Sequence, residues 1–469
     1  MNDNFDQYSE EEINDLKSKF FQMKSNGKNI YFDVDEYEGL INHFFESEDT
    51  ENIETLLSYA LDQHPGKYEF LLKKAQLFAI YGNDEQGLQI LDKLSSLGTD
   101  PDYYMIRGTL LSNLQKYREA IEEYTKALNQ GQDLEDVYTN IAFEYENLEQ
   151  FDKAIEYLSK SLKINPDNEA TLNEVGICFE MNNQSKDALV YFNHFIDLYP
   201  YSRAAWFNLA IAHNSLGNNT KAIDAYEYSL AIDENQPSAL FNIANIYAGM
   251  GKHKQAISFY SETLSKESPD AITYYYMGES YEKLDNYDEA LICYDKSYQV
   301  NQSFHESIIG SARCYFIIGS EEKAYAHIKK AIDLEEPFPL FWSIRSLKLD
   351  ESGYFTLARY TLIQLIKKFP KEPIYIINLA VLFSSHDMNH AIQVLNDSLL
   401  QFTESNERAL ILYFKGLYQM QNGKIKHGLK NFEKAILLNK EEFQNPLIQV
   451  ELANFSHPDL KALISNYNL

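Results

Sequence analysis

Residues 206–226 read WFNLAIAHNSLGNNTKAIDAY. Apolar residues recur at helical spacing on both sides of a Gly-Asn-Asn break at 217–219, which predicts two short helices joined by a tight turn. Two helices of this length bury too little apolar surface to be stable alone in water. The stretch therefore predicts that similar hairpins flank it along the chain.

Alanine recurs every 34 residues in register with this stretch, at Ala120, Ala154, Ala188, Ala222, Ala256, Ala290, Ala324 and Ala358. A second register lies twelve residues earlier and holds Gly108, Ala142, Gly176, Ala210, Ala244, Gly278, Ala312 and Ser346. Small residues let two helix backbones approach closely, while larger neighbours fill the groove. Each period thus predicts a hairpin in which helix A carries the first small residue and helix B carries the alanine. Glycine in the connecting turn supports this interpretation, at Gly217, Gly251, Gly319 and Gly353.

The pattern resembles the tetratricopeptide repeat, and unit 203–236 shows it as Trp206, Leu209, Ala210, Ala222 and Tyr226. The resemblance implies an all-α fold, a right-handed superhelical α-solenoid of antiparallel helix hairpins. We count about twelve units over residues 34–440, of which those over 101–372 are the most regular.

The two ends of the array need polar caps, because terminal repeats have no outer neighbour. We expect residues 1–33 to form an acidic leader and a capping helix, with a capping box at Ser9 and Glu12 and Gly27 closing the helix. Residues 441–469 are expected to form C-terminal capping helices.

Composition narrows the possible partners and surroundings. The 469-residue chain has a formal net charge of −29, and its first 63 residues hold 16 acidic residues against 4 lysines. Such a field repels nucleic acid and anionic lipid. The sequence shows no membrane-spanning run and no signal peptide, and its three cysteines are too few and too scattered for a disulfide framework. We therefore expect a cytoplasmic protein that neither binds nucleic acid nor inserts into a membrane. Its oligomeric state is left open.

The sequence shows no phosphate-binding loop, nucleophile elbow or zinc motif, so we expect no catalytic residue, no cofactor and no metal. His386 and His390 are four residues apart and could face one way as metal ligands, but no third ligand lies close in sequence. Cys178 and Cys314 share one helix-A position, where a small buried hydrophobe fits better than a reactive thiol.

In the tetratricopeptide family, helix A builds the concave side of the solenoid. By register, we expect a binding groove there, formed by Asn140, Phe143, Ile177, Phe207, Asn208, Ile211, Phe241, Asn242, Asn245, Tyr275, Glu279, Ile309 and Phe316. Four of these, Phe207, Phe241, Tyr275 and Ile309, share one position in consecutive units and are expected to form an apolar ridge. The ridge is either a recognition surface or a contact packed inside the superhelix.

Asparagine also recurs at one helix-A position, at Asn140, Asn208, Asn242 and Asn378. The arrangement resembles the asparagine ladder in the repeats of O-GlcNAc transferase, which implies contacts to a peptide backbone. Glu174, Tyr276 and Gly310 interrupt it here. The basic residues of the carboxylate clamp that binds chaperone tails are missing at the matching positions.

These observations favour a protein interaction scaffold or adaptor, which binds a protein or an extended segment in an acidic, aromatic-lined concave groove. Only Lys283 and Arg313 oppose the acidic residues that we assign to the groove wall, so we expect a segment that is basic and apolar. The alternative is a non-catalytic regulatory or targeting subunit of a larger complex, which binds through its convex face or its ends.

Overall fold

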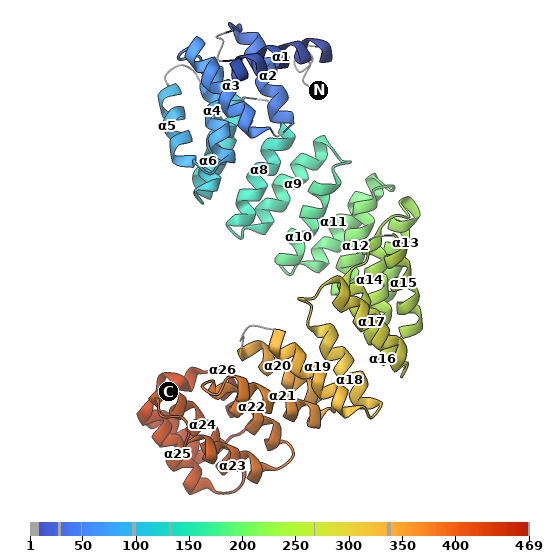
Figure 1. Ribbon diagram of the computed structural model, residues 1–469, viewed down its shortest axis with the longest axis vertical. Coiled ribbons are helices and arrows are strands. Elements are labelled where there is room, and N and C mark those ends of the chain that lie inside the picture. Colours follow the sequence, from blue (N-terminus) through green and yellow to red (C-terminus); the bar gives the residue numbers. More distant parts are fainter. Residues whose placement is uncertain are drawn as a thin grey trace. The chain divides into compact units, whose positions relative to one another are not determined.

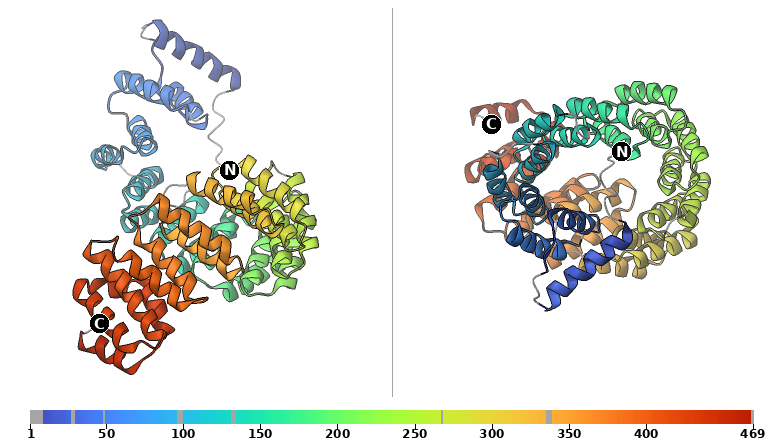
Figure 2. Two further views of the ribbon diagram at one scale, coloured as in Figure 1. Left: turned by 60° about the horizontal axis from the view of Figure 1, so that its bottom comes forward. Right: turned by 90° about the horizontal axis from the view of Figure 1, so that it is seen from above.

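The computed structural model describes residues 9–26, 30–47, 49–95, 100–130, 134–266, 268–334 and 339–467. Within these ranges every regular element is a helix, as predicted (Figure 1). The chain divides into two compact units, Met1–Asn235 and Gln236–Leu469. Consecutive hairpins lie side by side within each unit (Figures 1 and 2). The chain is thus an all-α solenoid of antiparallel hairpins.

Unit 1 contains a leading helix followed by six hairpins, each of which joins an even-numbered helix A to an odd-numbered helix B. These helices are α1 (Glu10–Asn26), α2 (Val34–Glu46), α3 (Thr50–Gln63), α4 (Tyr68–Ile80), α5 (Asp84–Leu94), α6 (Pro101–Asn113), α7 (Tyr117–Leu128), α8 (Leu134–Asn147), α9 (Phe151–Ile164), α10 (Glu169–Met181), α11 (Ser185–Leu198), α12 (Arg203–Ser215) and α13 (Asn219–Ile232).

Unit 2 contains six further hairpins and a short helical tail. Its helices are α14 (Pro237–Gly249), α15 (His253–Lys266), α16 (Ala271–Glu282), α17 (Tyr287–Val300), α18 (Glu306–Ile317), α19 (Glu321–Leu334), α20 (Pro339–Glu351), α21 (Phe355–Lys368), α22 (Pro373–Ser384), α23 (Met388–Ser398), α24 (Ser405–Gln421), α25 (Ile425–Leu438), the 3₁₀ helix η1 (Glu441–Gln444), α26 (Pro446–Ala453) and α27 (Pro458–Asn466).

The described helices α2 to α25 thus form twelve hairpins, which confirms the count made from the sequence. The capping box of α1 also forms, since the Ser9 backbone N–H donates to the Glu12 carboxylate (2.8 Å) and the Glu12 N–H to Ser9 Oγ (3.3 Å). Phe20 of α1 is buried against Phe44 of α2. Gly27 lies outside the described residues. The division into two capping segments and an array remains a prediction.

Both small-residue registers lie where the paired helices meet. All eight helix-B alanines are buried. A Cβ added at Gly108 would collide with the ring of Tyr124, and one at Gly278 would lie 2.9 Å from the ring of Tyr294. Glycine is needed at these two sites because the neighbouring tyrosine occupies the space of a side chain.

The turn within the hairpin places one residue in the left-handed region in each of eight consecutive repeats. These residues again lie 34 apart, at Gln115, Glu149, Asn183, Gly217, Gly251, Asp285, Gly319 and Gly353, with φ between 55° and 87°. Only four of them are glycine. The other four repeats therefore carry the backbone strain of an L-residue at positive φ.

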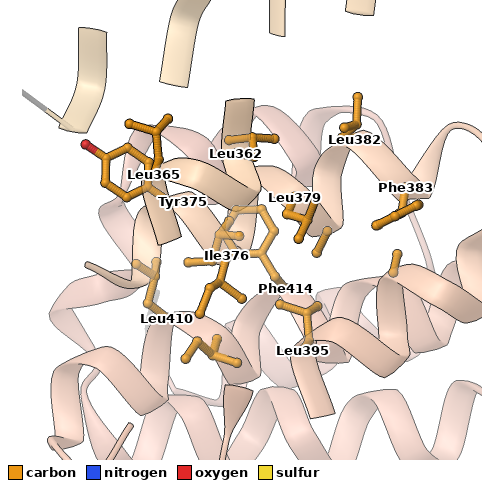
Figure 3. Packing of buried hydrophobic residues seen from close by; sticks show 14 of the residues in the cluster. Leu362, Leu365, Tyr375, Ile376, Leu379, Leu382, Phe383, Leu395, Leu410 and Phe414 are labelled. Atoms are coloured by element: carbon orange, nitrogen blue, oxygen red, sulfur yellow. The ribbon is translucent and has the colours of Figure 1, made fainter. Parts of the chain in front are cut away.

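The largest core cluster lies in unit 2 and runs from α18 to α27. Figure 3 shows part of it, where Leu362 and Leu365 of α21 and Leu395 of α23 surround side chains of α22 and α24 such as Ile376 and Phe414. In unit 1 the buried residues form smaller clusters that each join neighbouring helices. Each hairpin is therefore held by its neighbours, as expected for a repeat array.

The turn register gives a stability prediction. Gln115→Gly removes the strain of a left-handed L-residue at an exposed and uncharged site, so we expect it to raise the free energy of unfolding by about 1 kcal/mol. Gly217→Ala should lower it by about the same amount. Chemical denaturation of both variants checks this, and a loss of stability in Gln115→Gly would contradict it.

Candidate protein-binding surface on the A helices

The A helices of unit 1 are joined side by side through polar contacts. Asn208 of α12 donates from Nδ2 to Asn173 Oδ1 of α10 (2.8 Å). Glu146 of α8 and Glu174 of α10 share a side-chain hydrogen bond. We call the exposed side chains of α8, α10 and α12 the unit 1 A-face.

Apolar side chains are exposed on this face. Phe143 of α8 is 55% exposed, and Ile177 and Met181 of α10 are 49% and 62% exposed. Ile211 occupies the matching position on α12 and is half-buried. Phe143, Ile177 and Ile211 were predicted groove residues. Met181 was missed, although it lies one helical turn after Ile177 and could have been found from that spacing.

The charge of the unit 1 A-face is acidic. Helices α8 and α10 contain no Lys, Arg or His, and their exposed or half-buried acidic residues are Glu135, Asp136, Glu146, Glu169, Glu174 and Glu180. Glu144 is buried and does not contribute to the face. Arg203 of α12 is held in ion pairs with Glu169 and Asp233. A basic segment would therefore meet carboxylates on this face, with no described lysine or arginine of α8 or α10 to repel it.

The contact between Glu146 and Glu174 brings two carboxyl groups together. Burial, and then the charge of Glu174, raise the pKa of Glu146 to about 7. The thiol of Cys178 donates to Glu146 Oε1 (3.4 Å). Burial and the Glu146 carboxylate raise the pKa of that thiol well above its ordinary value. Cys178 is therefore an unreactive, packed side chain, as predicted.

Asn208 is buried, and its predicted exposure in the groove is wrong. It is 5% exposed, and Nδ2 also donates to the Ala204 carbonyl (2.9 Å). Its side chain occupies the space that a Cβ on Gly176 would need. The amide of Asn208 thus makes its hydrogen bonds within the array, at the contact between two repeats. Phe207 beside it is half-buried and packs edge-on against Tyr226, with ring centroids 5.3 Å apart.

The aromatic ridge residues of unit 2 are also largely packed against neighbouring rings. Phe241 of α14 contacts the rings of Tyr260 and Tyr276. Tyr275 of α16 contacts the ring of Tyr294. These rings therefore join neighbouring helices of the array.

Ile309 is 6% exposed and belongs to the large core cluster, so its predicted exposure in the groove is wrong. It lies next to Gly310 in the tightly packed α18, where most side chains are buried. Phe316, the last predicted groove residue, is half-buried against the same cluster.

A cavity of about 380 Å³ lies between α14, α15 and α16. The predicted residues Asn245 and Glu279 line it, together with Lys283. Tyr260 donates to Asn245 Oδ1 (2.6 Å), and Tyr275 donates to Glu279 Oε1 (2.7 Å). Two predicted groove residues of unit 2 thus lie together at one cavity.

Arg313 of α18 forms a charged network with Glu282 of α16 and Tyr294 of α17. Its guanidinium donates to both oxygens of Glu282 (3.1 and 2.9 Å) and to Tyr294 Oη (3.2 Å). Tyr294 in turn donates to Glu282 Oε2 (2.7 Å). Arg313 is one of the two basic residues predicted to oppose the acidic residues of the groove wall. Its guanidinium is instead paired with Glu282 and Tyr294 inside this network.

The asparagine ladder remains a prediction at Asn140 and Asn242, which are half-buried. Asn378 is 1% exposed, and within the described part of the chain neither polar atom of its amide has a hydrogen-bond partner. Its burial removes it from any exposed ladder.

The two histidines that were considered as metal ligands contact different residues. His386 contacts Asp350 (Nε2 to Oδ1, 3.3 Å), and His390 stacks on Phe383. No group of three potential metal ligands gathers within the described ranges.

Four family models match the sequence. Three describe tetratricopeptide repeats and match residues 101–130, 135–168 and 182–237. The fourth describes subunit 3 of the anaphase-promoting complex, or cyclosome, and matches residues 215–297. Together with the twelve hairpins, these matches define a repeat protein whose A and B helices form an α-solenoid. The chain is a tetratricopeptide repeat protein.

Several solved structures are similar over part of the chain. MamA shares 26% sequence identity over 36% of this chain and 93% of its own, with a TM-score of 0.32. A tetratricopeptide repeat protein from Parabacteroides merdae shares 16% identity over 53% of this chain and 99% of its own, with a TM-score of 0.39. YrrB, described as having an unusual peptide-binding site, shares 15% identity over 38% of this chain and 92% of its own, with a TM-score of 0.33. No curated protein sequence matches the chain.

None of the described helices combines the length and the apolar character that crossing a membrane requires.

The carboxyl pair predicts a pH dependence of stability. The pKa of Glu146 in the folded protein is about 7, above the roughly 4.3 of an unfolded glutamate. Between these two values the folded protein keeps the carboxyl group of Glu146 protonated, whereas the unfolded chain has lost that proton. The protonated Glu146 therefore contributes fully to the free energy of unfolding below about pH 4, and this contribution is lost as the pH rises to about 7. Glu146→Gln removes this loss. The melting temperature of the variant relative to the parent protein should therefore rise between about pH 5 and pH 8. Glu180→Gln, at an exposed site on α10, is the control, and a difference independent of pH would contradict the assignment.

The network of Arg313 predicts that substitutions at Arg313 and Glu282 affect the free energy of unfolding in a strongly coupled, non-additive way. Arg313→Ala leaves Glu282 without its buried partner and should cost about 3–5 kcal/mol of unfolding free energy. Arg313→Met combined with Glu282→Gln removes both charges, while the amide introduced at position 282 still accepts from Tyr294, so most of this loss should be recovered. Denaturant unfolding measures both. Equal losses would show that the charge pair is not what stabilises α16 and α18.

Proposed function

We propose that this protein is an interaction scaffold or adaptor that binds a protein or an extended segment on the unit 1 A-face. The observation that carries the proposal is the exposure of Phe143, Ile177 and Met181 on two adjacent helices. Exposed apolar side chains grouped on a solenoid wall are typical of binding surfaces, since they are buried only when a partner is bound.

The charge of the face defines the partner that fits it. The same two helices, α8 and α10, carry exposed or half-buried carboxylates and no basic residue. A segment that places Lys or Arg beside apolar side chains satisfies both features, whereas an acidic segment is repelled. In unit 2, Asn245 and Glu279 stay candidate binding residues, because both line the cavity between α14, α15 and α16.

A second candidate is a non-catalytic subunit of a larger complex that binds through its B helices or its ends. The match of residues 215–297 to subunit 3 of the anaphase-promoting complex supports this alternative. Exposed apolar residues also occur on helix B, where Val190 and Leu198 of α11 both face solvent. Neither candidate requires a catalytic residue, and the repeat fold serves binding in both.

The two candidates differ in the surface that they use. We would measure the binding of a fluorescent synthetic peptide that alternates Lys or Arg with Leu and Phe, using the full chain. Phe143→Ala with Ile177→Ala should weaken binding at least about tenfold, because truncating a hot-spot side chain costs about 1 kcal/mol or more. Added salt should weaken binding as well, since it screens the carboxylates.

Val190→Ala with Leu198→Ala is the control, because it removes two exposed apolar groups from helix B. Circular dichroism should show unchanged helicity in both double variants. Loss of binding only in the α11 pair would favour the second candidate. Equal binding by a peptide with Glu in place of Lys and Arg would refute the proposed charge preference.

A further inference from the structure

The last hairpin of unit 2 carries a concentration of positive charge. Residues 424–440 contain five lysines, Lys424, Lys426, Lys430, Lys434 and Lys440, against the single acidic residue Glu433. The chain as a whole has a net charge of −29. This segment therefore opposes the charge of the rest of the protein, and its lysines would attract a partner that the rest of the surface repels.

Three of these lysines share one face of α25. Lys426, Lys430 and Lys434 are four residues apart and exposed. The ion pairs found within the described ranges do not include them, and the one acidic residue of the segment, Glu433, accepts from Tyr467 Oη of the chain's tail (3.1 Å). Burial, and then the charge of Lys434, lower the pKa of Lys415 on α24. The lysine face thus carries three positive charges that form no ion pair among the described residues.

A cavity lined by both apolar and charged side chains adjoins this face. It has a volume of about 410 Å³ and lies between α25 and α27. Leu429 of α25 and Ala462 and Leu463 of α27 line it, and Lys426 and Lys430 stand beside them. The cavity is large enough for an apolar side chain, and the two lysines are placed to contact acidic groups next to that side chain.

We propose that the α25–α27 surface is a docking site for an acidic protein segment that inserts an apolar side chain between the two helices. Charge complementarity selects this partner. A nucleic acid fits the surface less well, because Leu429, Ala462 and Leu463 can take up an apolar side chain but offer nothing to a phosphate. The carboxylates of Glu433 and Asp459 also line the cavity, so the acidic groups of the partner must lie beside Lys426 and Lys430. The proposal goes beyond the proposed function, since it concerns another unit and a partner of opposite charge.

The test uses the full chain and a fluorescent synthetic peptide that alternates Glu or Asp with Leu. Anisotropy titrations at low and at physiological salt should show saturable binding that salt weakens. Lys426→Gln with Lys430→Gln should reduce the affinity roughly three- to tenfold, as expected when two exposed ion pairs are lost. Leu463→Ser should reduce it as well, because that change makes the cavity polar.

The matched control is Lys367→Gln with Lys371→Gln. This pair has the same spacing in sequence and is also exposed, with Lys367 in the last turn of α21 and Lys371 in the loop that follows, and it changes the net charge equally. Equal losses in the two pairs would reveal a diffuse electrostatic attraction and overturn the site. Undiminished binding of a polyglutamate peptide without Leu would overturn the role of the cavity. Binding of single-stranded DNA that is lost with Lys426 and Lys430 would assign the surface to nucleic acid instead.

Discussion

The close approach of paired helices is the constraint on which the rest of the structure depends. Alanines 34 residues apart are buried where helix A meets helix B, and glycine replaces alanine where a neighbouring tyrosine needs the space. In the last hairpin the approach is so close that a Cβ on Gly416 would lie 2.9 Å from the carbonyl oxygen of Gly428. Larger residues at these positions would separate the helices and open the core.

This packing decides which side chains remain for binding. The aromatic residues of the A helices were expected to form one continuous ridge, but several pack against helix B of their own hairpin, as Phe207 does on Tyr226. The exposed apolar groups lie elsewhere on the A helices of unit 1, at Phe143, Ile177 and Met181. A repeat array therefore presents a binding surface only where its own hairpins leave side chains uncovered.

Charge is distributed unevenly along the array. Helices α8 and α10 carry carboxylates without a single basic residue, whereas α25 presents lysines four residues apart. Between these extremes, Arg203 and Arg313 are committed to ion pairs within the array. The net charge of −29 is therefore a poor guide to any one surface, because binding responds to the local field.

The sequence by itself determined the hairpins, their period and the capping box at Ser9, because spacing along the chain sets helix contacts and turn geometry directly. Glycine marked the left-handed turn residue in four repeats, and only the backbone revealed it at Gln115, Glu149, Asn183 and Asp285. The exposure of groove residues was decided by tertiary structure. Asn208 is buried because Gly176 of the preceding repeat leaves room for its side chain. Ile309 is buried because it packs into a core cluster that several hairpins share. Such burial depends on the size of residues distant in sequence, which a single repeat does not encode.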